Sequence, residues 1–322
     1  MIYNDTPVNP ISDVAYATRA YHEVAGTLVG IPTGLPLTEN YWRLVKGQLT
    51  IITGIPGAGK SEVMDQVMVD SATNHGWKWL VLSPENLPLE VHAAKIVEKS
   101  LGMPFGKQAG FRMTGDDAYN ECKNIGDAIR MIQPDENTRL DLEWLLDTFN
   151  KAYADLPFDG LVIDPFAEME WRRPRGMSEH EYTGQVLTIF RRWARTKGVA
   201  FHIVAHPTKM KKLDENSTSE YAGEYPPPTP YDISGSSHWR NAADVCISMW
   251  RRYTDSNGDA DTSGMVEVHI QKIRNRLAGQ IGKVIQYWSY KTGRYYGSAD
   301  ERDQYERVAM GAAADAAAVE VF

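Results

Sequence analysis

Short apolar runs alternate with longer stretches of mixed polarity between residues 48 and 250. The runs typical of buried strands cover residues 49–53, 79–83, 161–164, 199–205 and 245–250. Stretches of helical length separate them, and this alternation is typical of parallel strands joined by crossover helices. The pattern therefore predicts an α/β fold with a mostly parallel central sheet.

Two later runs, residues 265–271 and 283–290, have alternating character and flank the turn-forming string GQIG. Alternation around a short glycine-containing turn predicts a pair of antiparallel strands. We expect this pair to extend the sheet antiparallel to its parallel part.

The two ends of the chain differ from the central part. Residues 11–29 carry apolar side chains at helical spacing and precede a Gly/Pro-rich turn, which predicts a linker helix in an N-terminal arm. Residues 310–322 are alanine-rich and predict a frayed helix or a simple tail. We therefore divide the chain into an arm (1–40), a main domain (41–298) and a low-complexity tail (299–322).

Composition narrows the class of protein. A length of 322 residues with 43% hydrophobic side chains is enough for one sizeable domain with a full core. No apolar stretch approaches the length of a membrane span and the N-terminus has no signal-peptide pattern, so we expect a cytoplasmic protein with no membrane partner. The two cysteines, Cys122 and Cys246, exclude a four-thiolate zinc ribbon and a disulfide framework. The net charge of −8 argues against a broad basic surface that coats nucleic acid.

The first apolar run leads into GIPGAGKS at residues 54–61, which matches the phosphate-binding pattern G-x-x-x-x-G-K-S between a strand and a helix. The glycines let backbone N–H groups curl around phosphates, Lys60 supplies a positive charge for the β- and γ-phosphates, and Ser61 offers a hydroxyl to Mg²⁺. The sequence therefore predicts a site for ATP, or another nucleoside triphosphate, with Mg²⁺. The residues expected to contact the nucleotide here are Gly54, Ile55, Pro56, Gly57, Ala58, Gly59, Lys60, Ser61 and Glu62.

Three further residues follow strand-like runs, at the sheet edge where nucleotides bind in α/β folds. Asp164 ends the run LVID and is expected to hold Mg²⁺ through water while Ser61 binds the ion directly. Glu85, in the string SPEN, is expected to orient or deprotonate the attacking water, with the alternative that it is only a helix-start carboxylate. His206, in the string AHPTK, is expected to sense the γ-phosphate, with the alternative that it is a structural histidine.

Six strings occur in one order along residues 44–297: ITGIPGAGKSE, SPEN, LVIDP, AHPTK, DISGSSHWRNAADVCISMWR and QKIRNRLAGQIG. Together they resemble the RecA-type hexameric replicative helicases, the DnaB-like and Twinkle-like group of superfamily 4, and in particular the Twinkle-like branch of bacteria and their phages. The resemblance implies a RecA-like P-loop NTPase core that hydrolyses ATP at the subunit interfaces of a ring, most often a hexamer.

The resemblance also implies roles for particular residues. Arg276 would be an arginine finger that reaches into a neighbouring subunit's ATP site, and the N-terminal helix would dock on the adjacent subunit. The lysine that family members carry two positions before the finger is Arg274 here, and Lys272 could substitute for it. Arg251 matches a position that family members bring near the nucleotide base. Primase and polymerase partners would go with such a helicase.

The resemblance further implies that loops after residues 164 and 206 grip single-stranded DNA in a central channel. The segment 208–231 is polar, proline-rich and too long for an ordinary connector, so it is either functional or disordered. An acidic exterior with a basic pore would reconcile the net charge with DNA binding, although each basic cluster could instead be a solvated loop. Trp239 is expected in the core or an interface rather than as a base-stacking platform. The residues expected to face the DNA are Lys209, Lys211, Lys212, Ser236, His238 and Arg240.

The sequence thus predicts an ATP-dependent replicative helicase that translocates on single-stranded DNA and unwinds forks. Two alternatives remain open: a RecA-like recombination or repair ATPase that forms filaments, and a ring protein that ATP switches without unwinding. About 40 residues precede the core, with neither the cysteines nor the carboxylate cluster of a primase-like domain, so we expect no primase activity in this chain.

Overall fold

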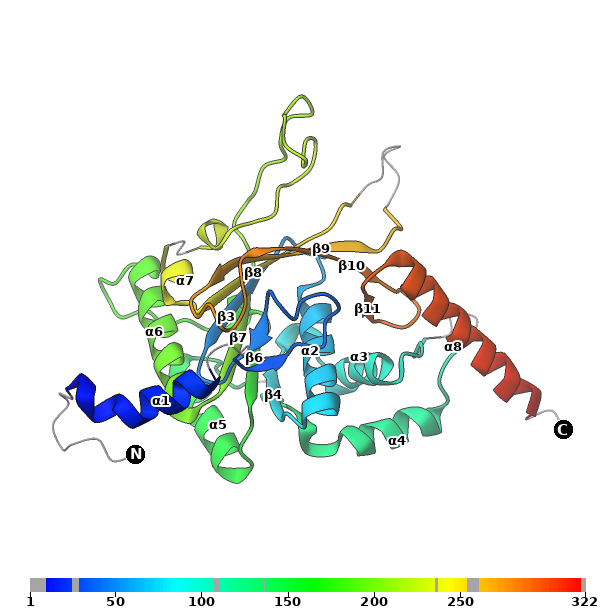
Figure 1. The fold of residues 1–322 in the computed structure, drawn as a ribbon, viewed down its shortest axis with the longest axis horizontal. Helices are drawn as coiled ribbons and strands as arrows, with labels where there is room; N and C mark the ends of the chain where they lie inside the picture. The colour runs from blue at the N-terminus through cyan, green and yellow to red at the C-terminus, as the bar shows by residue number, and fades with distance from the viewer. Residues whose placement is uncertain are drawn as a thin grey trace.

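The computed structural model describes residues 10–24, 29–106, 111–135, 137–234, 237–253 and 261–319. These residues form one nine-stranded sheet with the strand order β11-β10-β9-β8-β3-β7-β6-β4-β5 (Figure 1). Its strands in chain order are β3 (Leu49–Thr53), β4 (Trp79–Leu82), β5 (Ile129–Met131), β6 (Gly160–Ile163), β7 (Ala200–Ala205), β8 (Val245–Trp250), β9 (Met265–Ile273), β10 (Gly282–Trp288) and β11 (Tyr295–Tyr296).

The sheet has a parallel part and an antiparallel part. Every neighbouring pair from β8 through β3, β7, β6 and β4 to β5 is parallel. Strand β9 pairs antiparallel with β8, and β10 and β11 continue in the same alternating sense. The predicted α/β fold with an antiparallel C-terminal extension is therefore confirmed.

Helices cover both faces of the sheet. Successive residues of β3 face opposite sides, so Ile52 packs in one core cluster with Val67 of α2, whereas Ile51 packs in the other with Phe149 of α5 and Phe190 of α6. Burial on both faces explains why the parallel strands are continuous apolar runs. The helices of the body are α2 (Lys60–His75), α3 (Leu89–Leu101), α4 (Gly115–Ile125), α5 (Leu142–Asp155), α6 (Glu179–Lys197) and α7 (Ser237–Ala242).

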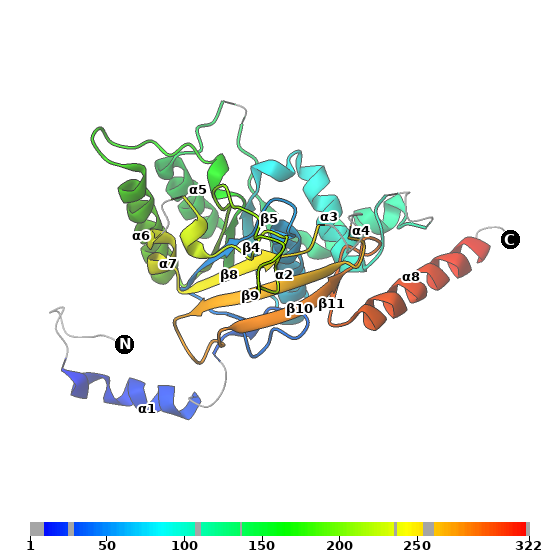
Figure 2. The same ribbon diagram turned by 90° about the horizontal axis from the view of Figure 1, so that it is seen from above.

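The N-terminal helix is shorter than predicted. A 3₁₀ turn at Ile11–Val14 leads into α1 (Ala15–Val24), and residues 25–28 lie outside the described part of the chain. Val29 is not helical because its N–H donates to the carbonyl oxygen of Leu277 at 2.7 Å, after which β1 (Ile31–Pro32) pairs with β2 (Arg43–Leu44). The prediction of a helix through residue 29 was therefore wrong at its C-terminal end. Figures 1 and 2 show α1 extending away from the body.

The C-terminal segment is a helix, α8 (Ala299–Val319), which extends from the body on the side opposite α1 (Figure 2). The long segment after β7 rises above the antiparallel strands in Figure 1. Its ends are held together, because the N–H of Thr208 donates to Asp232 O at 2.7 Å and Pro207 bridges to Ile233. None of the helices that the structure describes is long and apolar enough to span a bilayer.

Candidate functional site

The phosphate loop joins β3 to α2 and closes around the side chain of Lys60. The ammonium of Lys60 donates to the carbonyl oxygens of Gly54 at 2.8 Å and Ile55 at 3.2 Å. Gly59 precedes α2 with a φ of +92°, and a Cβ there would lie 2.5 Å from the Tyr295 hydroxyl, so this position requires glycine. Burial lowers the pKa of Lys60 to about 8, against the opposing effects of Asp164 and Glu85.

Three predicted residues join the phosphate loop at one edge of the sheet. Asp164 follows β6, Glu85 lies in a 3₁₀ turn (Pro84–Asn86) after β4, and His206 follows β7. Because β3, β7, β6 and β4 are neighbours in that order, the carboxyl ends of four adjacent parallel strands carry these groups. The structure thus brings together the chemistry that the sequence assigned to separate strings.

Asp164 lies behind the start of α2 and is almost fully buried. Burial raises the pKa of its carboxyl to about 6, and a hydrogen bond from the Ser61 hydroxyl acts in the opposite direction. These two groups are hard oxygen donors of the kind that Mg²⁺ takes from proteins, the remaining positions being filled by water and phosphate. Among the described residues no group of three or more His, Cys, Asp or Glu side chains comes together, which fits an ion held by few protein ligands.

Glu85 and His206 face each other across the pocket. The Nε2 atom of His206 lies 3.7 Å from Oε1 of Glu85, whose side chain is about half exposed at 48%. Burial and the charge of Lys60 lower the pKa of His206, and Glu85 acts in the opposite direction. His206 is therefore neutral at pH 7 and leaves Glu85 as a free carboxylate beside the phosphate loop.

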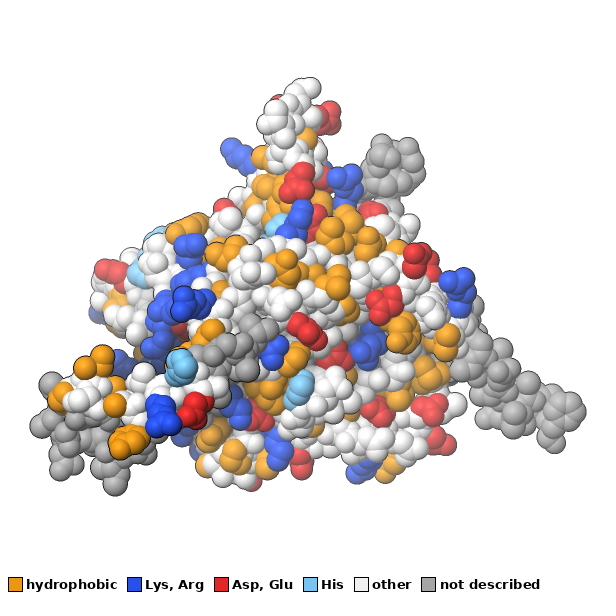
Figure 3. All heavy atoms as spheres, viewed as in Figure 1, with side chains coloured by type: hydrophobic (Ala, Val, Ile, Leu, Met, Phe, Trp, Pro, Cys, Tyr) orange, Lys and Arg blue, Asp and Glu red, His pale blue; other side chains and the backbone are white. Residues whose placement is uncertain are grey.

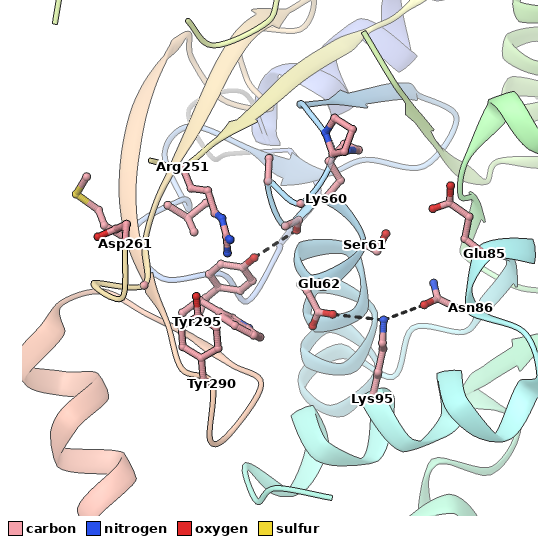
Figure 4. A pocket seen from close by; sticks show the side chains of 18 of the residues that line it. Lys60, Ser61, Glu62, Glu85, Asn86, Lys95, Arg251, Asp261, Tyr290 and Tyr295 are labelled. Atoms are coloured by element: carbon pink, nitrogen blue, oxygen red, sulfur yellow. Dashed lines mark hydrogen bonds and ion pairs between the residues drawn. The ribbon is translucent and has the colours of Figure 1, made fainter. Parts of the chain in front are cut away.

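These residues line a cavity of about 800 Å³. Figure 4 shows Glu85, Asn86 and Lys95 on one side of the start of α2, with Arg251 and Tyr295 on the other. The second side is aromatic and was not predicted apart from Arg251. It contains a T-shaped pair of Trp288 and Tyr290, with ring centroids 4.4 Å apart, and a Tyr295 hydroxyl that donates to Gly59 O.

Glu62 was expected to contact the nucleotide, but its carboxylate is engaged by α3. It forms ion pairs with Lys99, which is completely buried, and with Lys95 at 3.6 Å. Lys95 also donates to Oδ1 of Asn86 at 2.9 Å, as the dashed lines of Figure 4 show. The sequence contains no local signal for this network, because its members come from three separate segments.

The two arginines expected to act on a neighbouring subunit lie at the opposite edge of the sheet. The N–H of Arg274 donates to Asp244 O, just before β8, and the next hydrogen bond in that region joins Asp244 N to Leu49 O at the start of β3. β3 has five residues, so at about 3.3 Å per residue the phosphate loop lies roughly 16 Å away. Arg276 is exposed, and no partner for it occurs among the described residues.

The candidate DNA-facing residues fall into two groups. Lys209, Lys211 and Lys212 are exposed on the long segment, and Lys212 lies 5.6 Å from the ring centroid of Tyr225. His238 and Arg240 lie on α7, near the base of that segment, and are partly buried.

Two further residues of this region have different outcomes. Ser236 lies outside the described residues. Trp239 is buried and donates to Ser234 O at 2.6 Å, which bears out the expectation of a core residue.

A phosphate loop after a central parallel strand, with an acidic residue after the strand two places along the sheet, defines a P-loop NTPase of the RecA type. Residues 35–212 match the AAA domain family, and the chain belongs to it. Over 280 residues, 85% of this chain, it is 31% identical to the Twinkle homolog protein, chloroplastic/mitochondrial, of Arabidopsis thaliana. The chain spans about 37% of the length of that relative.

Two solved structures have the same fold. One is an ATPase domain solved by itself, which gives a TM-score of 0.70 at 15% identity and covers 90% of this chain and 99% of its own. A DnaB-like replicative helicase, described with its interactions with primase, gives 0.67 at 16% identity and covers 91% of this chain and 68% of its own. The chain is therefore a nucleotide-binding RecA-type ATPase core of the DnaB-like and Twinkle-like group, as its motifs predicted.

Proposed function

We propose that this chain is the motor of a replicative DNA helicase, which hydrolyses ATP between adjacent copies and moves along single-stranded DNA. One observation carries the proposal most directly. Arg276 is exposed at the sheet edge opposite the phosphate loop and has no partner among the described residues, so it cannot serve the pocket of its own chain. A second copy that presents its pocket to Arg276 would complete the site.

In this proposal the phosphate loop and Lys60 bind the β- and γ-phosphates of ATP. Ser61 and Asp164 would hold Mg²⁺, which neutralises charge on the phosphates when it is bound. The base would lie at the other side of the cavity, against Arg251 and the aromatic pair of Trp288 and Tyr290. A cation and aromatic rings suit the flat face of a base without selecting strongly among bases.

Hydrolysis would use Glu85, His206 and the finger of a neighbour. The free carboxylate of Glu85 orients and deprotonates the attacking water. The neutral His206 beside it would respond to the γ-phosphate and pass its loss to the long segment that follows. Arg276 of the neighbouring copy would stabilise the charge on the transferred phosphoryl group, an effect of order 10³ to 10⁵ in rate for such fingers.

Single-stranded DNA would bind along the long segment and α7. The exposed ammonium groups of Lys209, Lys211 and Lys212, with His238 and Arg240 nearby, suit a phosphate backbone read without sequence. Ser236 would add a hydroxyl to this surface. Several copies that converge on one channel would concentrate this local positive charge despite the net charge of −8.

The first test measures ATP hydrolysis and strand separation on a forked DNA substrate. The wild-type chain should hydrolyse ATP faster when single-stranded DNA is added, and Lys60→Ala should abolish turnover by removing the phosphate contact. Arg192→Gln serves as a control, because this arginine of α6 is exposed and lies outside the cavity. Near-normal turnover by Lys60→Ala would overturn the assignment of the site.

The second test asks whether the site is shared between copies. Arg276→Ala and Glu85→Ala should each remove hydrolysis while leaving nucleotide binding largely intact. Mixed assemblies of the two variants should regain part of the activity, because some interfaces then combine an intact Glu85 with an intact Arg276. Absence of rescue at every mixing ratio would contradict a finger supplied by a neighbour.

Two other functions would give different outcomes. A recombination or repair ATPase of this fold would form filaments on DNA, and an ATP-switched ring would assemble without DNA-stimulated hydrolysis or unwinding. Electron microscopy of the chain with single-stranded DNA and an ATP analogue separates rings from filaments. Added primase or polymerase tests the proposed replication partners by co-purification and by stimulation of unwinding.

A further inference from the structure

A buried carboxylate holds the segment that carries the proposed finger. Asp244 precedes β8, and its side chain is only 4% exposed. Its oxygens accept two hydrogen bonds from Arg191 of α6, at 2.8 and 3.3 Å, and one from the N–H of Leu49 at 3.1 Å. Nε of Arg274 lies 3.2 Å from the same carboxylate, and Arg195 lies 3.6 Å away.

The guanidinium of Arg274 is fully engaged within its own chain. Besides Asp244, it donates to the carbonyl oxygens of Asn241 at 2.9 Å and Ala243 at 3.3 Å. The main-chain N–H of Arg274 donates to Asp244 O at 2.9 Å, so both its backbone and its side chain are fixed to one residue. A planar fork of donors is the group that can satisfy a carboxylate and two carbonyls at once.

Lys272, the other candidate for a second trans-acting cation, is also engaged within its own chain. Its ammonium donates to the carbonyl oxygens of Ala243, at 2.7 Å, and Arg240, both at the end of α7. Burial lowers its pKa, in keeping with a group that faces the protein interior. Neither Lys272 nor Arg274 can reach a second chain without breaking these contacts.

The loop beyond Arg274 is ordered by short-range hydrogen bonds. Oδ1 of Asn275 accepts from the N–H of Leu277 at 3.0 Å, and the N–H of Gln280 donates to Tyr41 O at 3.2 Å. Arg276 projects from this loop without a partner in the part of the chain that the structure describes. Figure 3 shows lysine and arginine side chains gathered over the region of α6 and α7, where Arg274 and Arg276 are exposed.

We propose that Arg274 is a positioning residue rather than a second trans-acting cation, and that Asp244 holds the finger loop through it so that Arg276 alone reaches the neighbouring nucleotide. This inference rests on the proposed function. It departs from what the family pattern implies for this position, where the resemblance assigned Arg274 to the reaction itself. The same carboxylate binds the N–H of Leu49, so the finger loop shares its anchor with the strand that leads to the phosphate loop of its own chain.

The deciding variants are Arg274→Lys and Arg274→Gln. A trans-acting cation would tolerate lysine, which is the residue that the family carries there. A positioning residue would not, because one ammonium cannot satisfy the carboxylate and two carbonyls together. We expect both variants to lower kcat at least tenfold while KM for ATP stays within about twofold, since the neighbour's nucleotide is not contacted. Wild-type kcat in Arg274→Lys would overturn the proposal.

A double-mutant cycle with Asp244→Asn tests the route of the effect. If Arg274 acts through Asp244, the double variant Asp244→Asn/Arg274→Gln should lose no more activity than the more impaired single variant. Multiplied losses would show that Arg274 has an independent role and would refute the inference. Arg192→Gln is the matched control on α6, and thermal unfolding shows whether each variant is folded. If Asp244→Asn does not fold, the comparison of lysine with glutamine at position 274 decides alone.

A readout without activity separates this inference from the proposed function. Amide hydrogen exchange of residues 274–281 should accelerate at least tenfold in Arg274→Lys, whereas peptides covering the phosphate loop should be unchanged. Unchanged exchange in residues 274–281 would refute the positioning role even in an active enzyme. Accelerated exchange in a chain that hydrolyses no ATP would support the anchor and reject the proposed motor.

Discussion

The Lys99 ammonium is the most stringent test of how polar groups are buried around the phosphate loop. Lys99 has no exposed side-chain surface, and it pairs with the carboxylate of Glu62, which is 24% exposed. Removal of one partner of a buried ion pair leaves an uncompensated charge and costs about 3–5 kcal/mol. Because Glu62 retains some contact with water, we expect Glu62→Gln to lower the free energy of unfolding by about 3 kcal/mol, the lower end of that range.

Removal of the ammonium should have a different result. Lys99→Met leaves Glu62 near water and within 3.6 Å of Lys95, so we expect the free energy of unfolding to change by about 1 kcal/mol or less. In the Lys99→Met background, Glu62→Gln should likewise cost less than about 1 kcal/mol, which gives a coupling energy of about 2 kcal/mol.

Urea unfolding of the nucleotide-free chain, followed by tryptophan fluorescence, measures these differences. Asp147→Asn is the control, because Asp147 and Lys151 form an exposed pair at 2.7 Å on α5 and its loss should cost no more than about 0.5 kcal/mol. If Glu62→Gln unfolds within about 1 kcal/mol of the wild type, the burial of Lys99 does not depend on Glu62 and the reasoning fails.

Three further measurements test other parts of the structure. Since burial raises the pKa of Asp164 to about 6, ATP hydrolysis at limiting Mg²⁺ should fall as the pH drops below about 6, and more Mg²⁺ should move that fall to lower pH; a pH-independent rate between about 5 and 7 would contradict this. Replacement of the three lysines of the long segment by glutamine should lower the salt slope of single-strand binding by about 2, whereas an unchanged slope would locate the DNA elsewhere. Gly160→Ala would put a Cβ 2.3 Å from the ring of Trp79 and should destabilise the fold by about 1–3 kcal/mol, with Gly115→Ala, which meets no neighbouring atom, as the control in thermal unfolding.

The sheet was largely predictable from the sequence because its parallel strands are buried on both faces. Each of the five predicted runs became a strand, with ends within one residue of the prediction. The missed strand β5 (Ile129–Met131) has three residues and a charged centre, so it has no apolar run. Strand β11 (Tyr295–Tyr296) is shorter still and depends on its pairing with β10.

The phosphate side of the pocket was predictable for a different reason. Its residues directly follow strands, and the carboxyl ends of neighbouring parallel strands must meet at one edge. The aromatic side was not, because Trp288, Tyr290 and Tyr295 join the phosphate loop only through the antiparallel extension, more than 200 positions along the chain. No local pattern distinguishes such rings from ordinary core residues.

Charged residues were the hardest to interpret from sequence. Glu62 follows the phosphate-binding motif directly, yet its carboxylate pairs with α3, and Arg274 occupies a position associated with catalysis, yet it is bound to Asp244. In both cases the partner lies on a distant segment. A charge pattern gives the sign of a group but not which of several opposite charges it will meet.

The separation of pocket and finger to opposite edges of one sheet has a consequence for assembly. On the proposed function, each copy contributes half of a site at one edge and half at the other, so contacts between copies run head to tail. An open chain of copies then has one complete site fewer than it has members, whereas a closed ring has as many sites as members. Closure of the ring therefore adds a working site as well as a contact, and dilution that opens rings should lower the activity per copy before the copies separate.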